Sequence, residues 1–254
     1  MPIGPARMPL MDHLGELRRR LMIIVVCLLV SACVLYAISP QIIEFLTLPI
    51  QEFIPDKLVV LNAFGGFTLK FLVALFAAAV VCSPIIFWEI LAFFLPALKE
   101  NERRMVLPTF FIAVALFVLG MVFCYAFCLN AAFQFLMGES ASIGTVMPEA
   151  ADYVKYVILF LLAFGIAFEL PLVVFYLILF DIVPYKTMRA NWRYVYVGLM
   201  VLSAVVTPDA SPVTMIILFA ALLALYEVAL FVARIALARK IKRQKEAEAQ
   251  EEAE

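Results

Sequence analysis

Three glutamates, Glu89, Glu169 and Glu227, interrupt long stretches of sequence that otherwise carry no charge. A charged side chain at the centre of a membrane helix costs about 2.5–3.5 kcal/mol on insertion scales, so each of these positions needs a physical reason. Such a carboxyl group can relay a proton, pair with a cation or bind a polar group of another protein. The three residues are therefore the first candidates for function.

Glu169 is the most isolated of the three, because it lies near the middle of the interval between Tyr156 and Asp181. The predicted spans contain no Lys or Arg that could pair with it. Pro171 has no backbone N–H and therefore frees a carbonyl one turn earlier. We expect Glu169 to be protonated through desolvation or to face a polar group on another subunit.

The other two glutamates lie closer to the ends of their apolar runs. Glu89 follows Trp88 near the inner end of its run, where it can snorkel to the interface. Glu227 precedes Arg234 by two helical turns, so an intramolecular ion pair is one explanation and a contact with another protein is the alternative.

A second acidic pattern surrounds the first apolar run. Leu10, Leu14, Leu17 and Leu21 form one helical stripe, which predicts an interfacial amphipathic helix that begins near Asp12. The polar side of this helix holds Glu16 and three arginines, and Glu16 can pair with Arg19 or Arg20 at helical spacing.

A short loop further along the chain combines aromatic and acidic residues. Phe93 and Phe94 precede Pro96, and Glu100 and Glu102 follow it. The loop can be an ordinary solvated connection, but aromatic side chains beside carboxylates also suit the recognition of a cationic peptide.

The composition identifies the elements that must position these residues. The chain has 254 residues, of which 66% are hydrophobic and 15% are charged, with a mean hydropathy of +1.06. Soluble domains average roughly 45–50% apolar residues, so the excess must face lipid. The sequence predicts an all-α polytopic membrane protein with six transmembrane helices. The spans lie within 21–43, 71–98, 105–138, 156–180, 194–208 and 213–233.

The fifth and sixth helices are predicted to be short. The fifth run reaches only about 22 Å against a hydrocarbon core of about 30 Å, so it must thin the bilayer locally or be covered by neighbours. It must nevertheless cross, because six spans place all but three of the 19 basic residues on one side. This bias predicts that both termini are cytoplasmic.

We expect one six-helix membrane domain at 1–239 and a charged, disordered cytoplasmic tail at 240–254. The long segments at about 40–68 and 137–152 are expected to form a structured outer cap. The five cysteines all lie in apolar runs, so we expect neither a disulfide framework nor a metal site. No cofactor, nucleic-acid partner or enzymatic activity is expected.

Four collinear motifs resemble those of TatC, the six-span receptor subunit of the twin-arginine protein translocase. Residues 13–20 resemble its HLxELRxR motif, and 92–104 resemble its AFxxPALxxxERR motif. Residues 164–171 match its FGxxFExP segment, and 207–209 lie where it has a TPxD-like turn. The resemblance implies a receptor in the bacterial inner membrane that moves folded proteins by using the proton-motive force.

The resemblance also implies roles for particular residues. Glu16 and Glu102 would bind the paired arginines of the signal peptide, on one surface with Phe93 and Leu98. Arg18 would also take part in binding the signal peptide. A guanidinium binds a carboxylate in a bidentate manner that lysine does not reproduce.

Further roles lie elsewhere in the chain. Glu169, with Pro171 and Glu227, would meet polar groups of single-span TatA- or TatB-type subunits in an oligomeric complex. The short fifth and sixth helices would provide the docking edge. Pro49 and Asp209 would shape the outer cap.

The sequence departs from the family pattern at two positions. Glu89 replaces an expected glutamine, and the Thr-Pro-Asp turn is shorter than the common double-proline form. A proton-coupled solute transporter with a Glu169–Glu227 relay is the main alternative, and a purely structural subunit is another. A transporter should show matched halves and a polar midplane cavity, whereas this sequence shows one isolated midplane acid.

Overall fold

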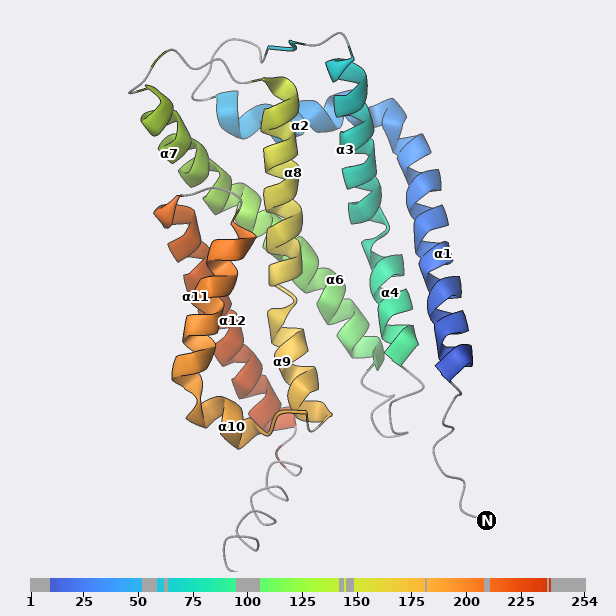
Figure 1. Ribbon diagram of the computed structural model, residues 1–254, viewed down its shortest axis with the longest axis vertical. Coiled ribbons are helices and arrows are strands. Elements are labelled where there is room, and N and C mark those ends of the chain that lie inside the picture. The colour runs from blue at the N-terminus through green and yellow to red at the C-terminus, as the bar shows by residue number, and fades with distance from the viewer. Residues whose placement is uncertain are drawn as a thin grey trace, which may run out of the picture. The chain divides into compact units, whose positions relative to one another are not determined.

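All regular elements in the part of the chain that the structure describes are helices (Figure 1). The computed structural model describes residues 10–51, 59–61, 64–94, 106–141, 144, 149–180, 182–207, 211–236 and 238. The elements are α1 (Leu10–Leu35), η1 (Tyr36–Ile38), α2 (Ser39–Gln51), α3 (Gly65–Val81), α4 (Ser83–Phe94), α6 (Val106–Phe123), the π-helix η3 (Cys124–Cys128), α7 (Leu129–Ala141), α8 (Ala150–Ala167), α9 (Leu170–Leu179), α10 (Tyr185–Ala190), α11 (Trp192–Val206) and α12 (Pro212–Ala236).

Four helical stretches are long and apolar enough to cross a membrane, namely Leu14–Gln51, Val106–Ala141, Ala150–Leu179 and Pro212–Ala236. The bent pair of α3 and α4 makes a fifth if it is counted as one span. The chain is therefore a multi-pass, all-α membrane protein, as predicted, whereas the count of six spans stays a prediction. The predicted shortness holds for α11, with 15 residues, but is wrong for α12, which has 25 residues.

The bend between α3 and α4 was not predicted, and its cause is local. The two helices meet at Cys82 at an angle of 54°. Pro84 lacks the N–H that would bond to the Val80 carbonyl oxygen, and the Ser83 hydroxyl donates to that oxygen instead, at 2.7 Å. The substitute bond satisfies the carbonyl while the helix changes direction.

The chain divides into two compact units, which we describe separately. Unit 1 comprises residues 1–115 and 145–158, and unit 2 comprises 116–144 and 159–254. In unit 1, α1 packs against α3 and α4, and α2 packs against α3 (Figure 1). Small buried residues of α3, including Ala74 and Ala78, allow these close approaches.

The predicted cap segments contact each other within unit 1. The Ala150 N–H donates to the Val59 carbonyl at 2.9 Å, and the Tyr153 hydroxyl donates to the Leu46 carbonyl at 3.1 Å. Pro49 lies inside α2, which these contacts anchor. The cap prediction for Asp209 lies outside the described residues.

In unit 2, α12 packs against α7, α9 and α11. The core of this unit is built from large apolar side chains that are almost fully buried, among them Phe160, Phe164, Ile178, Leu218 and Leu222. In a soluble protein, burying a large apolar side chain contributes about 1.5–3 kcal/mol to stability. Between helices in lipid, close packing takes the place of this contribution. The helices of this unit therefore depend on shape complementarity.

Candidate functional site

Two carboxylates and one guanidinium form a cluster where α1 meets α4. Arg20 donates from Nε to Glu16 Oε1 at 3.1 Å, and from Nη2 to the same oxygen. It also donates from Nη1 to Glu89 Oε2 at 2.8 Å. The sequence left Arg19 and Arg20 open as partners of Glu16, and the structure selects Arg20. The link to Glu89, 69 positions further along the chain, was missed because no local spacing reports it.

The cluster is half-buried and carries unequal charge. The exposed fractions of the side chains are 22% for Arg20, 23% for Glu16 and 13% for Glu89. Two carboxylates with one guanidinium leave one negative charge without a counter-ion in the cluster. Glu16 Oε2 is buried and accepts no hydrogen bond from the described residues. A buried acceptor without a donor costs roughly 1–3 kcal/mol, so this oxygen is ready to accept one.

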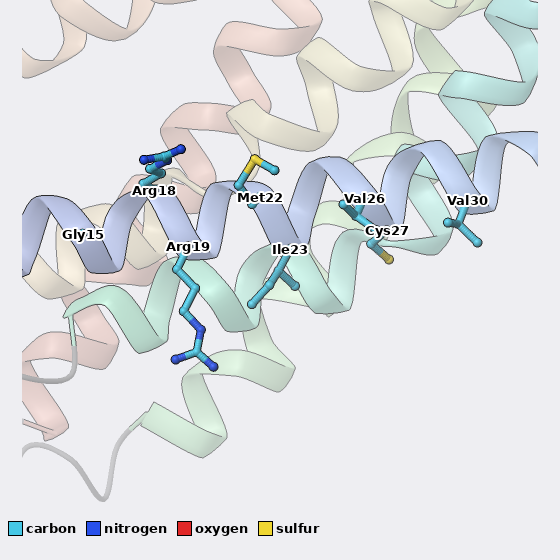
Figure 2. Close-up of a pocket in the computed structure, with 8 residues that line it drawn as sticks. All are labelled: Gly15, Arg18, Arg19, Met22, Ile23, Val26, Cys27 and Val30. Atoms are coloured by element: carbon cyan, nitrogen blue, oxygen red, sulfur yellow. The ribbon is translucent and has the colours of Figure 1, made fainter.

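Arg18 lies on a different side of α1 from this cluster. Residues two positions apart on a helix are rotated by about 200°, so Arg18 and Glu16 point in nearly opposite directions. Arg18 and Arg19 line the end of a groove of about 750 Å³. Figure 2 shows their side chains leaving α1 in different directions, with the apolar groove residues Met22, Ile23, Val26, Cys27 and Val30 following along the same helix.

The aromatic part of the predicted peptide surface lies on α4. Phe93 is half-buried and lies four residues after Glu89, which places both side chains on the same side of the helix. Phe93 therefore lies one turn beyond the carboxylate cluster. The predictions for Leu98 and Glu102 fall outside the described residues.

Glu169 lies at a break between α8 and α9 in unit 2. Helix α8 ends at Ala167 and α9 begins at Leu170, with Pro171 at its start. The Glu169 carbonyl accepts the N–H groups of Leu172 at 3.0 Å and Val173 at 3.1 Å, so the chain resumes its helical bonding at once. The side-chain oxygen Oε1 is buried and has no hydrogen-bond partner among the described residues.

The break is held against α6 by close packing. The ring of Phe168 lies 5.3 Å from that of Phe123, between centroids. A methyl carbon added at Gly120 would lie 2.7 Å from the carbonyl oxygen of Phe164 and 2.9 Å from Phe168 Cβ. Gly120 thus lets the two helices approach closely enough to fix Phe168 and, beside it, Glu169. Sequence reasoning missed this role because a glycine inside an apolar run is not distinctive.

Glu227 belongs to a second ion pair in unit 2. Arg189 donates to both of its carboxylate oxygens, at 3.1 and 2.8 Å, and the Tyr196 hydroxyl donates to Oε1 at 2.7 Å. The hydrogen bond and the negative charge of Glu227 raise the pKa of the Arg189 guanidinium above its ordinary value. The partner of Glu227 is therefore Arg189 of α10, and the suggested pairing with Arg234 is wrong.

Glu227 therefore differs from Glu169, because Glu227 is paired with a cation and the buried Oε1 of Glu169 has no partner among the described residues. The Arg189 side chain is 57% exposed and that of Glu227 is 38% exposed, so solvent or lipid headgroups reach the pair. Ion pairs at such exposed positions contribute little to stability. Among the described residues, no group of three or more His, Cys, Asp or Glu side chains could hold a metal ion.

Comparisons with known proteins agree along nearly the whole chain. The family model "Sec-independent protein translocase protein (TatC)" matches residues 12–220. A TatC protein of Deinococcus radiodurans is 36% identical over 235 residues, covering 91% of this chain and 87% of the relative. A TatC protein of Aquifex aeolicus is 30% identical over 241 residues, covering 94% of this chain and 100% of the relative.

The solved structures give the same match in three dimensions. A crystal structure of the twin-arginine translocase receptor TatC superimposes with a TM-score of 0.73 and 29% identity. It covers 88% of this chain and 99% of the solved one. A second crystal structure of that receptor, in the detergent DDM, gives a TM-score of 0.74 and 28% identity.

Proposed function

Because this chain belongs to the TatC family of Sec-independent protein translocase proteins, we propose that it is a receptor for twin-arginine signal peptides. In this proposal it binds the peptide at the cytoplasmic face of the bacterial inner membrane. It then nucleates a complex that moves folded proteins across the membrane with the proton-motive force. The solved relatives described as twin-arginine translocase receptors support this assignment.

One observation carries the proposal: Glu16 already binds a guanidinium group. Arg20 approaches one oxygen of its carboxylate, Oε1, with two nitrogens, so this carboxylate accepts hydrogen bonds from an arginine side chain. The second carboxylate oxygen is buried and accepts no hydrogen bond from the described residues. A planar guanidinium can use both oxygens of a carboxylate, whereas an ammonium group acts as a point charge, which favours arginine over lysine.

The remaining predicted residues complete the proposed surface. Phe93 lies on the side of α4 that carries Glu89, so an aromatic ring borders the carboxylates. Arg18 belongs to the groove along α1 and would contact the peptide from that side. Glu102 and Leu98, on the adjoining loop, are proposed from the motif alone.

We further propose that Glu169 contacts a polar group of a single-span TatA- or TatB-type subunit. Its buried Oε1 lacks a hydrogen-bond partner among the described residues. In lipid such a group needs a partner more urgently than in water, because no solvent can supply one. A polar side chain on a neighbouring transmembrane helix would satisfy it.

A crosslinking experiment tests the receptor role. A twin-arginine signal peptide with a photoreactive residue beside the arginine pair is added to membranes that contain the full chain. We expect Glu16→Gln to reduce crosslinking strongly and Glu102→Ala to reduce it as well. A peptide with a lysine pair should crosslink poorly to the unsubstituted protein.

Glu44→Gln is the matched control, because Glu44 is an exposed acid on α2 outside the cluster. Its crosslinking should equal that of the unsubstituted protein. If Glu16→Gln and Glu102→Ala both crosslink normally while membrane levels are equal, the receptor assignment is wrong.

A further inference from the structure

We propose that Glu89 is an additional specificity-determining carboxylate of the receptor site. Arg20 is then an internal counter-ion: when a peptide guanidinium displaces Arg20 from Glu16, Arg20 stays bound to Glu89. This inference rests on the proposed receptor function. It assigns a role to Glu89 of α4, which departs from the family pattern, and to Arg20 of α1, which lies in the motif at 13–20 but has no role from it.

The atoms that Arg20 uses make the exchange feasible. Nε and Nη2 bond to Glu16, whereas Nη1 bonds to Glu89 at 2.8 Å. Because the two carboxylates are held by different nitrogens, Arg20 can release Glu16 without releasing Glu89. A guanidinium has five N–H donors in a fixed plane, so the bond to Glu89 also keeps the group oriented.

Charge balance favours the arrival of a second guanidinium. The cluster of Glu16, Glu89 and Arg20 carries a net charge of about −1, because two ionised carboxylates face one cation. One peptide arginine would make it neutral. The side chains are largely shielded, with Glu89 13% exposed, and attraction between charges is stronger there than in bulk water.

Hydrogen bonding points to the same occupant. Glu16 Oε2 is a buried acceptor without a donor among the described residues. A bound guanidinium would satisfy this oxygen, so the penalty of burial would be relieved only when the peptide is present. Within the part of the chain that the structure describes, this oxygen therefore lacks a donor, and a bound cation would supply one.

Glu89 decides how available Glu16 is. If residue 89 were a neutral glutamine, Arg20 would be balanced by Glu16 alone, and the cluster would already be neutral before a peptide arrived. Glu89 shares Arg20 with Glu16 through a separate nitrogen, so one guanidinium faces two carboxylates and one negative charge is left for a second cation. The affinity of the site for a peptide guanidinium thus depends on residue 89 as well as on Glu16.

Binding of a fluorescent twin-arginine signal peptide to the purified full chain in nanodiscs tests the inference. Glu89→Gln should weaken binding about tenfold, which corresponds to about 1.4 kcal/mol. Adding Arg20→Gln to this variant should restore affinity to within about threefold of the unsubstituted protein, because the cluster again carries one negative charge. A merely structural ion pair predicts the opposite, since the double variant would bind less well than Glu89→Gln.

The outcomes separate this inference from the proposed function. Glu16→Gln should abolish binding in every background, and normal binding by both Glu16→Gln and Glu102→Ala overturns the receptor assignment itself. If Glu16→Gln loses binding but Glu89→Gln binds like the unsubstituted protein, only the role of Glu89 is refuted. Absence of rescue in the double variant refutes the role of Arg20. The isosteric Glu89→Gln change keeps an acceptor for Arg20, so the single variant retains the fold, and Glu44→Gln serves as control.

Discussion

Gly120→Ala should separate α6 from α8 and destabilise the packing around Glu169. The added methyl carbon would lie 2.7 Å from the Phe164 carbonyl oxygen, whereas ordinary contacts begin at 3.4 Å. The helices would have to move apart by about 0.7 Å, because a backbone oxygen cannot turn aside as a side chain can. Overpacking of this kind costs about 1–3 kcal/mol.

Part of this cost is offset by helix propensity, since alanine is favoured over glycine in a helix by about 0.5–1 kcal/mol. The net loss is therefore about 0–2.5 kcal/mol, or up to roughly 10 °C in the apparent melting temperature for a chain of this size. Gly165→Ala should cost less, because its new methyl meets the Phe117 ring at 2.8 Å, and a side chain can shift. Gly198→Ala, with nothing within 4 Å, should be neutral or stabilising.

The measurement is the fraction of detergent-solubilised protein that stays monodisperse after heating at one fixed rate, because membrane proteins often unfold irreversibly. The expected order of stability is Gly198→Ala, then Gly165→Ala, then Gly120→Ala. Equal melting temperatures for Gly120→Ala and Gly198→Ala would refute the argument that a close approach at Gly120 holds the helices together.

Three further predictions follow from individual contacts. Glu169→Ala should spare signal-peptide crosslinking but reduce co-purification of a single-span subunit, whereas Glu169→Gln should retain it because the amide keeps the shape and a hydrogen-bonding group; full co-purification with alanine contradicts the proposed contact. Tyr196→Phe removes one hydrogen bond to Glu227 and should lower the apparent melting temperature by less than about 4 °C, and a larger loss would show that the pair is more than a surface contact. Tyr153→Phe removes the bond to the Leu46 carbonyl and should speed proteolysis or hydrogen exchange in α2 but not in α12, and unchanged exchange in α2 would contradict the anchoring.

The helical content was predictable because the apolar excess and its interruptions are properties of composition and local order. The uncharged intervals located the helices, but the break between α8 and α9 was not predicted, although Pro171 was expected to free a carbonyl one turn earlier. The bend at Cys82 was missed although Pro84 is visible in the sequence, because a proline in an apolar run can end, bend or begin a helix. Only the hydrogen bond from Ser83 to Val80 identifies the outcome.

Local spacing predicted one ion pair correctly and another wrongly. Glu16 and Arg20 are four residues apart on one helix, and helical geometry alone brings them together. Glu227 and Arg234 satisfy a similar periodicity, yet Glu227 binds Arg189. Arg189 lies on α10, and its contact with Glu227 of α12 cannot be predicted from the spacing of residues within α12.

The sequence by itself determined that this is a multi-pass helical membrane protein, and its motifs indicated the TatC family. Those conclusions depend on residue types and local periodicity, which every stretch of chain carries on its own. The tertiary structure decided which charges meet. Glu89 pairs with Arg20, Arg189 pairs with Glu227, and Gly120 allows Phe168 to pack closely. These contacts form because packing brings together helices that are distant in sequence.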